Sequence, residues 1–132
     1  MKTGVAVARV SLGLIFVVFG LNGFLLFITP PEHTTVGNAF INLLMTTGFM
    51  YVEKSFEIIG GALLLLDLYV PLGLSVLAPI VVSIVLFHLL MERNTLVIGV
   101  VPFLLWVILV WAYRGQFASL LVRRAAAGSG NQ

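Results

Sequence analysis

Long runs of apolar residues recur four times along the chain, separated by short polar breaks. They cover about residues 5–28, 51–66, 71–91 and 96–113. As a helix, the first run is roughly 36 Å long at ~1.5 Å per residue, which exceeds a hydrocarbon core of about 30 Å. Helices are expected because a spanning segment must satisfy its backbone polar groups internally. The pattern predicts an all-α, four-transmembrane-helix bundle that forms a single integral membrane domain over residues 1–132.

The breaks between the runs carry recognisable stop signals. Thr29-Pro30-Pro31 ends the first run, because proline lacks an amide donor and restricts the residue before it. In the connection that follows, Val36–Met50 mixes apolar residues with Asn and Thr, which predicts a short interfacial or re-entrant helix between the first two spans. Asp67 and Pro71 mark a tight turn, since the 34 residues from Ile58 to Met91 are too many for one ordinary span.

Composition supports the membrane assignment and removes several kinds of chemistry. The chain is 61% hydrophobic and 9% charged, with a mean hydropathy of +1.16, which is far too apolar for a soluble domain. Lipid is therefore the expected solvent. Because the chain has no cysteine, it cannot form disulfides, thiol nucleophiles, iron–sulfur clusters or covalent haem links. Redox chemistry would need a bound cofactor.

The basic residues are unevenly placed. Those on the side of the two termini are Lys2, Arg9, Arg114, Arg123 and Arg124, whereas Lys54 and Arg93 lie on the opposite side. Since basic residues favour the cytoplasmic side, we expect a multi-pass protein of the bacterial inner membrane with both termini in the cytoplasm. The net charge of +2 then reflects topology and the lipid bilayer, with no nucleic-acid partner. Residues 115–132 are expected to form a cytoplasmic amphipathic tail, a surface helix followed by a loose segment.

Polar side chains inside the apolar runs fall at a similar depth near the opposite membrane face. Glu53 and Glu57 are four residues apart, as are His88 and Glu92, so each pair can share one helix face. Gly60 and Gly61 would let a neighbouring helix or ligand approach closely. The candidate ligand-binding pocket consists of Asn22, Glu53, Glu57, His88 and Glu92.

Each of these residues also has a structural interpretation. In a functional role, Glu57 can relay protons or bind a headgroup. In a structural role, it can pair with Lys54 or Arg93, or remain hydrated at the membrane interface. His88 can donate a proton to a bound oxygen or to Glu57, or simply link two helices. Asn22 can tie helices together, as buried amides commonly do in membranes.

Other site chemistry is less favoured by the pattern. A metal shared by His88, Glu92, Glu53 and Glu57 is an alternative, but one such motif is weak support and no metal is expected. Haem lacks an obvious second axial ligand. Phenylalanines at helical spacing can face a quinone ring, although they are more typical of core or lipid-facing positions; these are Phe16, Phe19, Phe24 and Phe27. We assign no catalytic residue.

Several short segments resemble those of a known family. They are Arg9-Val-Ser-Leu-Gly-Leu-Ile-Phe, Phe19-Gly-Leu-Asn-Gly-Phe, Phe56-Glu-Ile-Ile-Gly-Gly-Ala-Leu-Leu-Leu, Leu77-Ala-Pro-Ile and Leu86-Phe-His-Leu. Together they resemble the DoxX family of small four-helix membrane proteins, over residues 9 to about 114. The resemblance implies a four-helix bundle and an association with thiosulfate:quinone oxidoreductase, quinone or catechol resistance, or membrane oxidoreductase complexes. Asn22, Glu57 and His88 occupy the polar positions of the matching motifs, whereas cysteines used by some related redox proteins are missing.

These observations predict a role in a membrane redox process. They do not identify a specific catalytic activity. We expect a small accessory subunit of a larger membrane redox or energy-converting complex. A non-catalytic subunit is favoured over an enzyme, and the expected partners are other membrane-protein subunits. The alternative is a self-sufficient quinone-binding or quinone-modifying protein that uses Glu57 and His88. No covalently bound cofactor is expected, and a quinone or a lipid is the candidate ligand. A transporter or channel is less favoured, because the two halves show no inverted repeat.

Overall fold

Helices make up the whole of the regular structure in the part of the chain that the computed structural model describes, residues 2–124 and 126–128. No strand occurs in these residues, so the all-α prediction is confirmed there. The elements in order are α1 (Lys2–Leu25), α2 (Thr35–Thr47), α3 (Phe49–Leu65), α4 (Val70–Leu90), the 3-10 turn η1 (Arg93–Thr95), α5 (Leu96–Ala112), α6 (Arg114–Phe117) and the 3-10 turn η2 (Ala118–Leu121).

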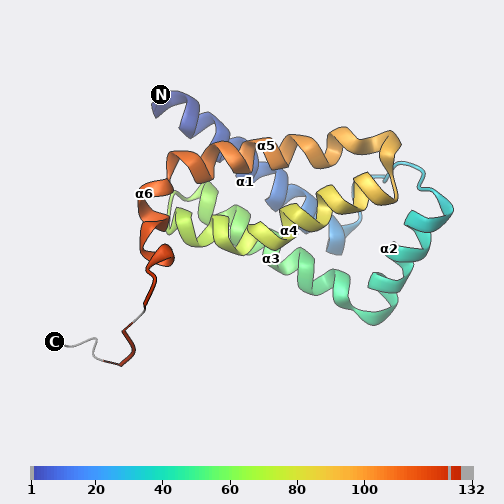
Figure 1. The fold of residues 1–132 in the computed structure, drawn as a ribbon. Coiled ribbons are helices and arrows are strands. Elements are labelled where there is room, and N and C mark those ends of the chain that lie inside the picture. The colour runs from blue at the N-terminus through green and yellow to red at the C-terminus, as the bar shows by residue number, and fades with distance from the viewer. Residues whose placement is uncertain (1, 125, 129–132) are drawn as a thin grey trace.

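Four of the helices run lengthwise and side by side, alternating in direction. In Figure 1, α1, α3, α4 and α5 form the body, α2 closes one end, and α6 lies at the other end, the end at which α1 begins. We call these the α2 end and the terminal end. Because the direction alternates, the first part of α3 and α5 and the last part of α1 and α4 all lie at the α2 end.

Within the described part of the chain, three segments are long and apolar enough to cross a membrane: α1, α4, and η1 together with α5. Their apolar stretches have mean hydropathies of 2.2, 2.5 and 2.5, yet only 28%, 33% and 17% of those residues are buried inside the protein. Most apolar side chains therefore face outward, as they do when lipid is the solvent. The predicted second span corresponds to α3, which has 17 residues and carries three charged side chains, so by length and composition it stands apart from the other three.

The first helix is shorter at its end than the predicted span of residues 5–28. It stops at Leu25, and Leu26 turns the chain with a positive φ of 53°. The Asn22 side-chain oxygen accepts a hydrogen bond from the Ile28 amide at 2.7 Å. Because this amide oxygen binds a backbone donor outside the helix, the helix ends before the proline pair is reached.

The connection between the first two long helices contains a helix, as predicted, and both of its ends are capped. At its start, Thr34 Oγ1 accepts a hydrogen bond from the Gly37 amide at 3.0 Å. At its end, Gly48 adopts a left-handed φ of 81°, a conformation that glycine reaches without steric cost. The chain continues directly into α3, so Gly48 sets the angle at which α2 meets the bundle.

The core lies between α1, α3, α4 and α5, and it is formed mainly by leucines. The fully buried apolar side chains are Leu12, Phe16, Leu64, Leu74, Leu77, Val81 and Leu109. Arg9 of α1 donates a hydrogen bond to the Leu64 carbonyl, and its Nε lies 3.6 Å from the Asp67 carboxylate in the turn after α3. Trp106 of α5 donates to the Leu74 carbonyl of α4 at 3.0 Å. These polar contacts fix the helices at the terminal end.

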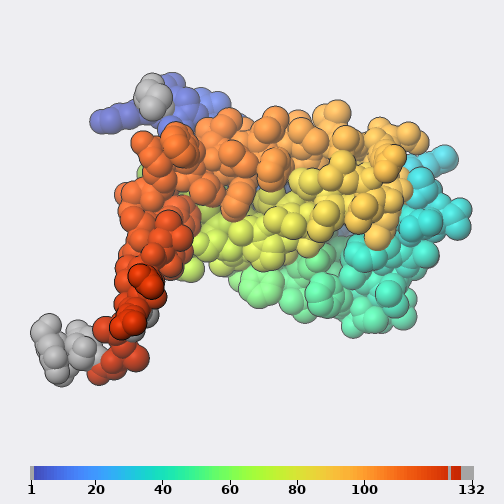
Figure 2. Space-filling view, in the orientation of Figure 1, coloured from blue at the N-terminus to red at the C-terminus, as the bar shows by residue number. Residues whose placement is uncertain are grey.

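The C-terminal segment differs from the predicted surface helix over residues 115–132. Only the short α6 and η2 are helical, and the chain is irregular from Val122 onward within the described residues. Phe117 packs against the core, whereas the following residues leave the bundle, as Figure 2 shows. The expected loose end falls partly on residues 125 and 129–132, which lie outside the described residues.

Candidate ligand-binding site

A cavity of about 500 Å³ lies in the half of the bundle nearest the α2 end. Its wall is made by the last part of α1, by α2, by the first part of α3, by the last part of α4 and by the first part of α5. The helix directions explain this position. α1 and α4 end at the α2 end and α3 and α5 begin there, so the parts of these four helices that line the cavity lie close together. A volume of this size accommodates a small organic ligand.

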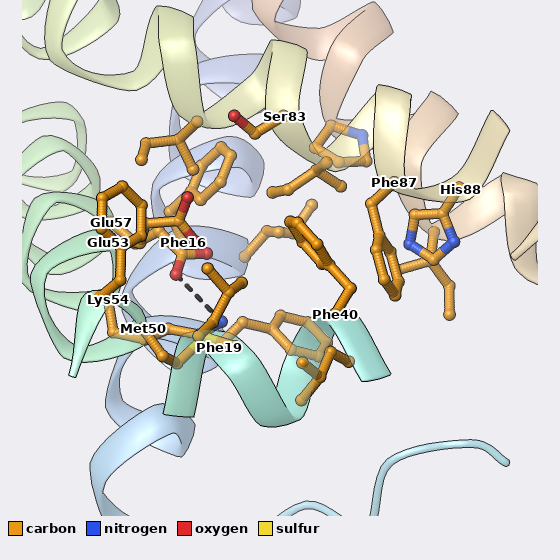
Figure 3. Close-up of a pocket in the computed structure, with 18 residues that line it drawn as sticks. Phe16, Phe19, Phe40, Met50, Glu53, Lys54, Glu57, Ser83, Phe87 and His88 are labelled. Atoms are coloured by element: carbon orange, nitrogen blue, oxygen red, sulfur yellow. Dashed lines mark ion pairs between the residues drawn. The ribbon is translucent and has the colours of Figure 1, made fainter. Parts of the chain in front are cut away.

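Phenylalanine rings form much of the wall. They come from four helices and are Phe16, Phe19, Phe40, Phe49 and Phe87. The rings of Phe40 and Phe87 lie 5.8 Å apart and tilted by 32°. In Figure 3 these two rings lie between the carboxylates on one side and His88 on the other. The cavity therefore has two polar regions separated by an aromatic one.

The first polar region contains an ion pair within α3. Glu57 is 3% exposed, and its Oε2 lies 3.0 Å from Lys54 Nζ, which is the contact dashed in Figure 3. The Lys54 stem packs on α1, where a Cβ added to Gly23 would lie 2.8 Å from Lys54 Cδ. Glu57 thus pairs with one of the two basic residues considered from sequence. A buried carboxylate held in this way is stable in place, since its charge is compensated.

Glu53 lies beside this pair, one turn earlier on α3. Its side chain lines the cavity and is half-buried. Within the described residues it accepts no hydrogen bond and takes part in no ion pair, unlike Glu57. The Glu53 carboxylate is therefore open to bind a donor or a positive charge inside the cavity.

The second polar region contains His88 of α4, whereas Ser83, nearer the middle of the same helix, lies on the carboxylate side in Figure 3. His88 is 5% exposed, and its Nδ1 lies 2.9 Å from Thr95 Oγ1. Thr95 Oγ1 also lies 3.2 Å from the Glu92 carbonyl, so its single proton can go to that carbonyl or to His88 Nδ1. The first arrangement leaves His88 Nε2 as an acceptor, and the second leaves it as a donor. The Ser83 hydroxyl lines the cavity and adds a group that can both donate and accept.

Glu92 does not line the cavity, although it follows His88 by four residues. It is 1% exposed, and its Oε1 accepts hydrogen bonds from the Thr34 amide at 2.6 Å and from the Thr34 hydroxyl at 3.0 Å. His33 Nδ1 lies 3.6 Å from the same oxygen. Glu92 therefore fixes the N-terminus of α2 to the junction between α4 and α5. Its contribution to the cavity is indirect.

The five residues predicted for the pocket thus divide into two groups. Glu53, Glu57 and His88 line the cavity, whereas Asn22 and Glu92 bind backbone donors near the ends of α1 and α2. The alternative of a shared metal finds no support in the geometry, since no three His, Asp or Glu side chains among the described residues are placed so that they could hold one metal ion.

Some wall residues had no signal in the sequence. Of the phenylalanines that the sequence offers as ring-facing candidates, Phe16 and Phe19 line the cavity. Phe24 lies outside it and packs against Tyr51, with the ring centroids 5.5 Å apart. The α2 contribution, including Phe40, depends on how α2 folds back over the bundle. Ser83 is a lone hydroxyl in an apolar run, a pattern that does not distinguish a ligand group from a helix contact.

Comparison of the chain with protein-family models, with curated proteins and with solved structures finds no match. The functional proposal therefore rests on the geometry and chemistry of the cavity.

Proposed function

We propose that the chain is a four-span protein of the cell membrane, with α3 as the additional span and both termini in the cytoplasm. α3 packs between α1 and α4, and its 17 residues extend about 25 Å at ~1.5 Å per residue. A span of this length fits a bilayer that thins slightly, or one in which flanking residues reach the interface. Its charged residues lie toward the α2 end, where headgroups and water are near. Membership of the DoxX family, suggested by the sequence segments, is part of this proposal.

The proposed function is binding of a ring-bearing amphiphile, with a quinone as the candidate ligand. The observation that carries this proposal is the cavity of about 500 Å³, with phenylalanine walls and polar groups on two sides. Phenylalanine faces suit a flat ring, and ring oxygens need hydrogen-bonding groups at the edges. Because quinone oxygens accept hydrogen bonds, the donors are the Ser83 hydroxyl and His88 on α4 and, when protonated, the carboxylates on α3. Glu57 and His88 are the proposed proton donors or headgroup ligands, and Glu53 joins them because it has no ion-pair or hydrogen-bond partner among the described residues.

A blocking substitution tests this function. Leu44 lines the cavity from α2, whereas the adjacent Leu43 is 62% exposed and lies outside it. Leu44→Trp should fill the cavity and abolish saturable binding of a short-chain quinone to the purified protein, measured by titration calorimetry. Leu43→Trp is the matched control and should bind with unchanged affinity. Equal quinone affinity in both variants would refute the cavity as the binding site.

The polar groups are tested separately. Ser83→Ala should weaken quinone binding roughly tenfold, since a hydrogen bond of about 1–1.5 kcal/mol is lost. Ser75→Ala is the control, because Ser75 lies on the same helix but bonds to the Pro71 carbonyl, away from the cavity. If the double variant Glu57→Gln with His88→Phe binds quinone as the unmodified protein does, these two residues have no role in the site.

A role as an accessory subunit is the second candidate, and the C-terminal segment favours it. Leu120, Leu121 and Val122 are 72%, 85% and 59% exposed on a segment that projects from the terminal end (Figure 2). Three consecutive exposed apolar residues are typical of a contact surface. Mild solubilisation followed by mass spectrometry should recover larger membrane subunits together with this chain. Recovery of the chain alone, as a monomer or self-oligomer, would contradict this role.

A further inference from the structure

The ionisable residues that line the cavity carry an excess of negative charge. They are Glu53, Glu57 and Lys54, together with His88, which is neutral when it is unprotonated. Lys54 is already paired with Glu57 at 3.0 Å, and Glu53 has no partner in the described residues. One formal negative charge therefore remains without compensation. A negative charge at the edge of an apolar cavity is costly unless a positive charge approaches it.

The aromatic wall favours the same kind of ligand. Five phenylalanine rings surround the space next to the carboxylates. The face of an aromatic ring carries partial negative charge and attracts cations, particularly where water is excluded. A carboxylate combined with several ring faces is a recognised arrangement for binding organic cations such as quaternary ammonium groups. Neutral rings gain from the phenylalanines but not from the uncompensated carboxylate.

Access to the cavity explains why such a cation would have to be lipophilic. Several lining residues are also exposed on the outer surface of the bundle, among them Phe19 at 42%, Phe49 at 55% and Ile98 at 47%. In the proposed membrane setting these apolar residues face lipid, so a ligand can enter from the bilayer. A small hydrated cation would not follow this path, whereas a cation with a large apolar surface would.

The distribution of charged residues along the chain also favours a cationic ligand. The α2 end carries four of the five acidic residues, which are Glu32, Glu53, Glu57 and Glu92, but only two of the seven basic residues, Lys54 and Arg93. An excess of acidic groups raises the local concentration of cations near the cavity.

We infer that the cavity binds lipophilic organic cations, in which positive charge is shielded by aromatic or alkyl groups, and that Glu53 is the residue that compensates their charge. This inference rests on the proposal that the cavity is a ligand site in a membrane. It goes beyond that proposal because it specifies the charge of the ligand and a residue that selects it.

A pair of ions with matched shape and opposite charge tests the inference. The full-length protein in nanodiscs of neutral lipid is titrated with tetraphenylphosphonium and, separately, with tetraphenylborate, and binding to protein-free nanodiscs is subtracted. Saturable binding of the cation at least tenfold tighter than that of the anion is expected. Equal affinity, or tighter binding of the anion, would overturn the inference on the unmodified protein alone, whether or not any variant folds.

The role of Glu53 is tested by Glu53→Gln, which removes the charge and keeps the shape. Phosphonium affinity should fall about tenfold, whereas Glu32→Gln, the same change at an exposed acid of the same end, should leave it unaltered. Unchanged phosphonium affinity in a folded Glu53→Gln protein would remove Glu53 from the inference.

Quinone titration of the same samples separates this inference from the proposed function. If quinone binds but phosphonium does not, the cavity is a neutral-ligand site and only the cation inference fails. If phosphonium binds but quinone does not, the quinone proposal fails. If neither ligand binds to the unmodified protein, both proposals fail.

Discussion

Four ionisable side chains near the α2 end serve different purposes, and their partners decide which. Glu57 pairs with Lys54, Glu92 accepts hydrogen bonds from Thr34, and Glu53 has neither kind of partner in the described residues. Since a buried charge must be compensated, the first two act in the structure of the protein and the third is available for a ligand. His88 is anchored through Nδ1, and its Nε2 makes no hydrogen bond in the described residues.

Substitution of Glu92 should destabilise the protein more than its position near a loop suggests. Glu92→Ala leaves the Thr34 amide without its acceptor in a partly buried site, at a cost of about 1–3 kcal/mol in the free energy of unfolding. Glu92→Gln keeps one acceptor oxygen and should cost about half as much. Unfolding by denaturant titration in detergent measures both. Glu32→Ala is the control and should have no measurable effect, because Glu32 is exposed; a similar loss in both alanine variants would contradict the role of Glu92.

At the scale of helices, contact between α1 and α3 depends on Gly13 of α1 and Gly61 of α3, which face each other. A Cβ added to Gly61 would lie 2.9 Å from the Gly13 carbonyl oxygen and 2.9 Å from the Val17 amide nitrogen. Gly60, the adjacent residue, faces α4 instead, where its Cβ would lie 2.7 Å from Leu77 Cδ2. The close approach expected at Gly60 and Gly61 thus occurs on two sides of α3, toward α4 at Gly60 and toward α1 at Gly61.

Gly61→Val should therefore separate α1 from α3. Backbone atoms cannot move aside as flexible side chains do, so a loss of about 1–3 kcal/mol in stability is expected. The measurement is the thermal unfolding midpoint in detergent. Gly4→Ala is the matched control on α1, because a Cβ there meets nothing within 4 Å; its midpoint should be unchanged or slightly higher. An unaltered midpoint in Gly61→Val would mean that this contact contributes little to packing.

At the scale of the whole molecule, charge and cavity occupy defined ends. Five of the seven basic residues lie at the terminal end, and the cavity lies toward the α2 end. If basic residues set the orientation, the cavity opens in the outer half of the membrane.

This orientation can be measured directly because the chain has no cysteine. A single cysteine introduced at the exposed Asn94 should react with a membrane-impermeant maleimide in intact spheroplasts. A cysteine at the exposed Ser119 should react only after the membrane is permeabilised. The reversed pattern would place the termini outside, and reaction at both positions in sealed spheroplasts would show that α5 does not cross the membrane.

The sequence by itself determined the all-helical fold, the apolar segments and the helix in the first connection, because these follow from local hydrophobicity and backbone preferences. It also identified Glu53, Glu57 and His88, since polar groups within apolar runs are visible without coordinates. Only the tertiary structure decided which of them share a cavity. Asn22 and Glu92 lie at helix ends, where side-chain direction depends on the path of the loop, so helical spacing could not show that they bind backbone donors. The contribution of α2 to the wall was likewise hidden, because it depends on a turn at Gly48 that places distant parts of the chain side by side.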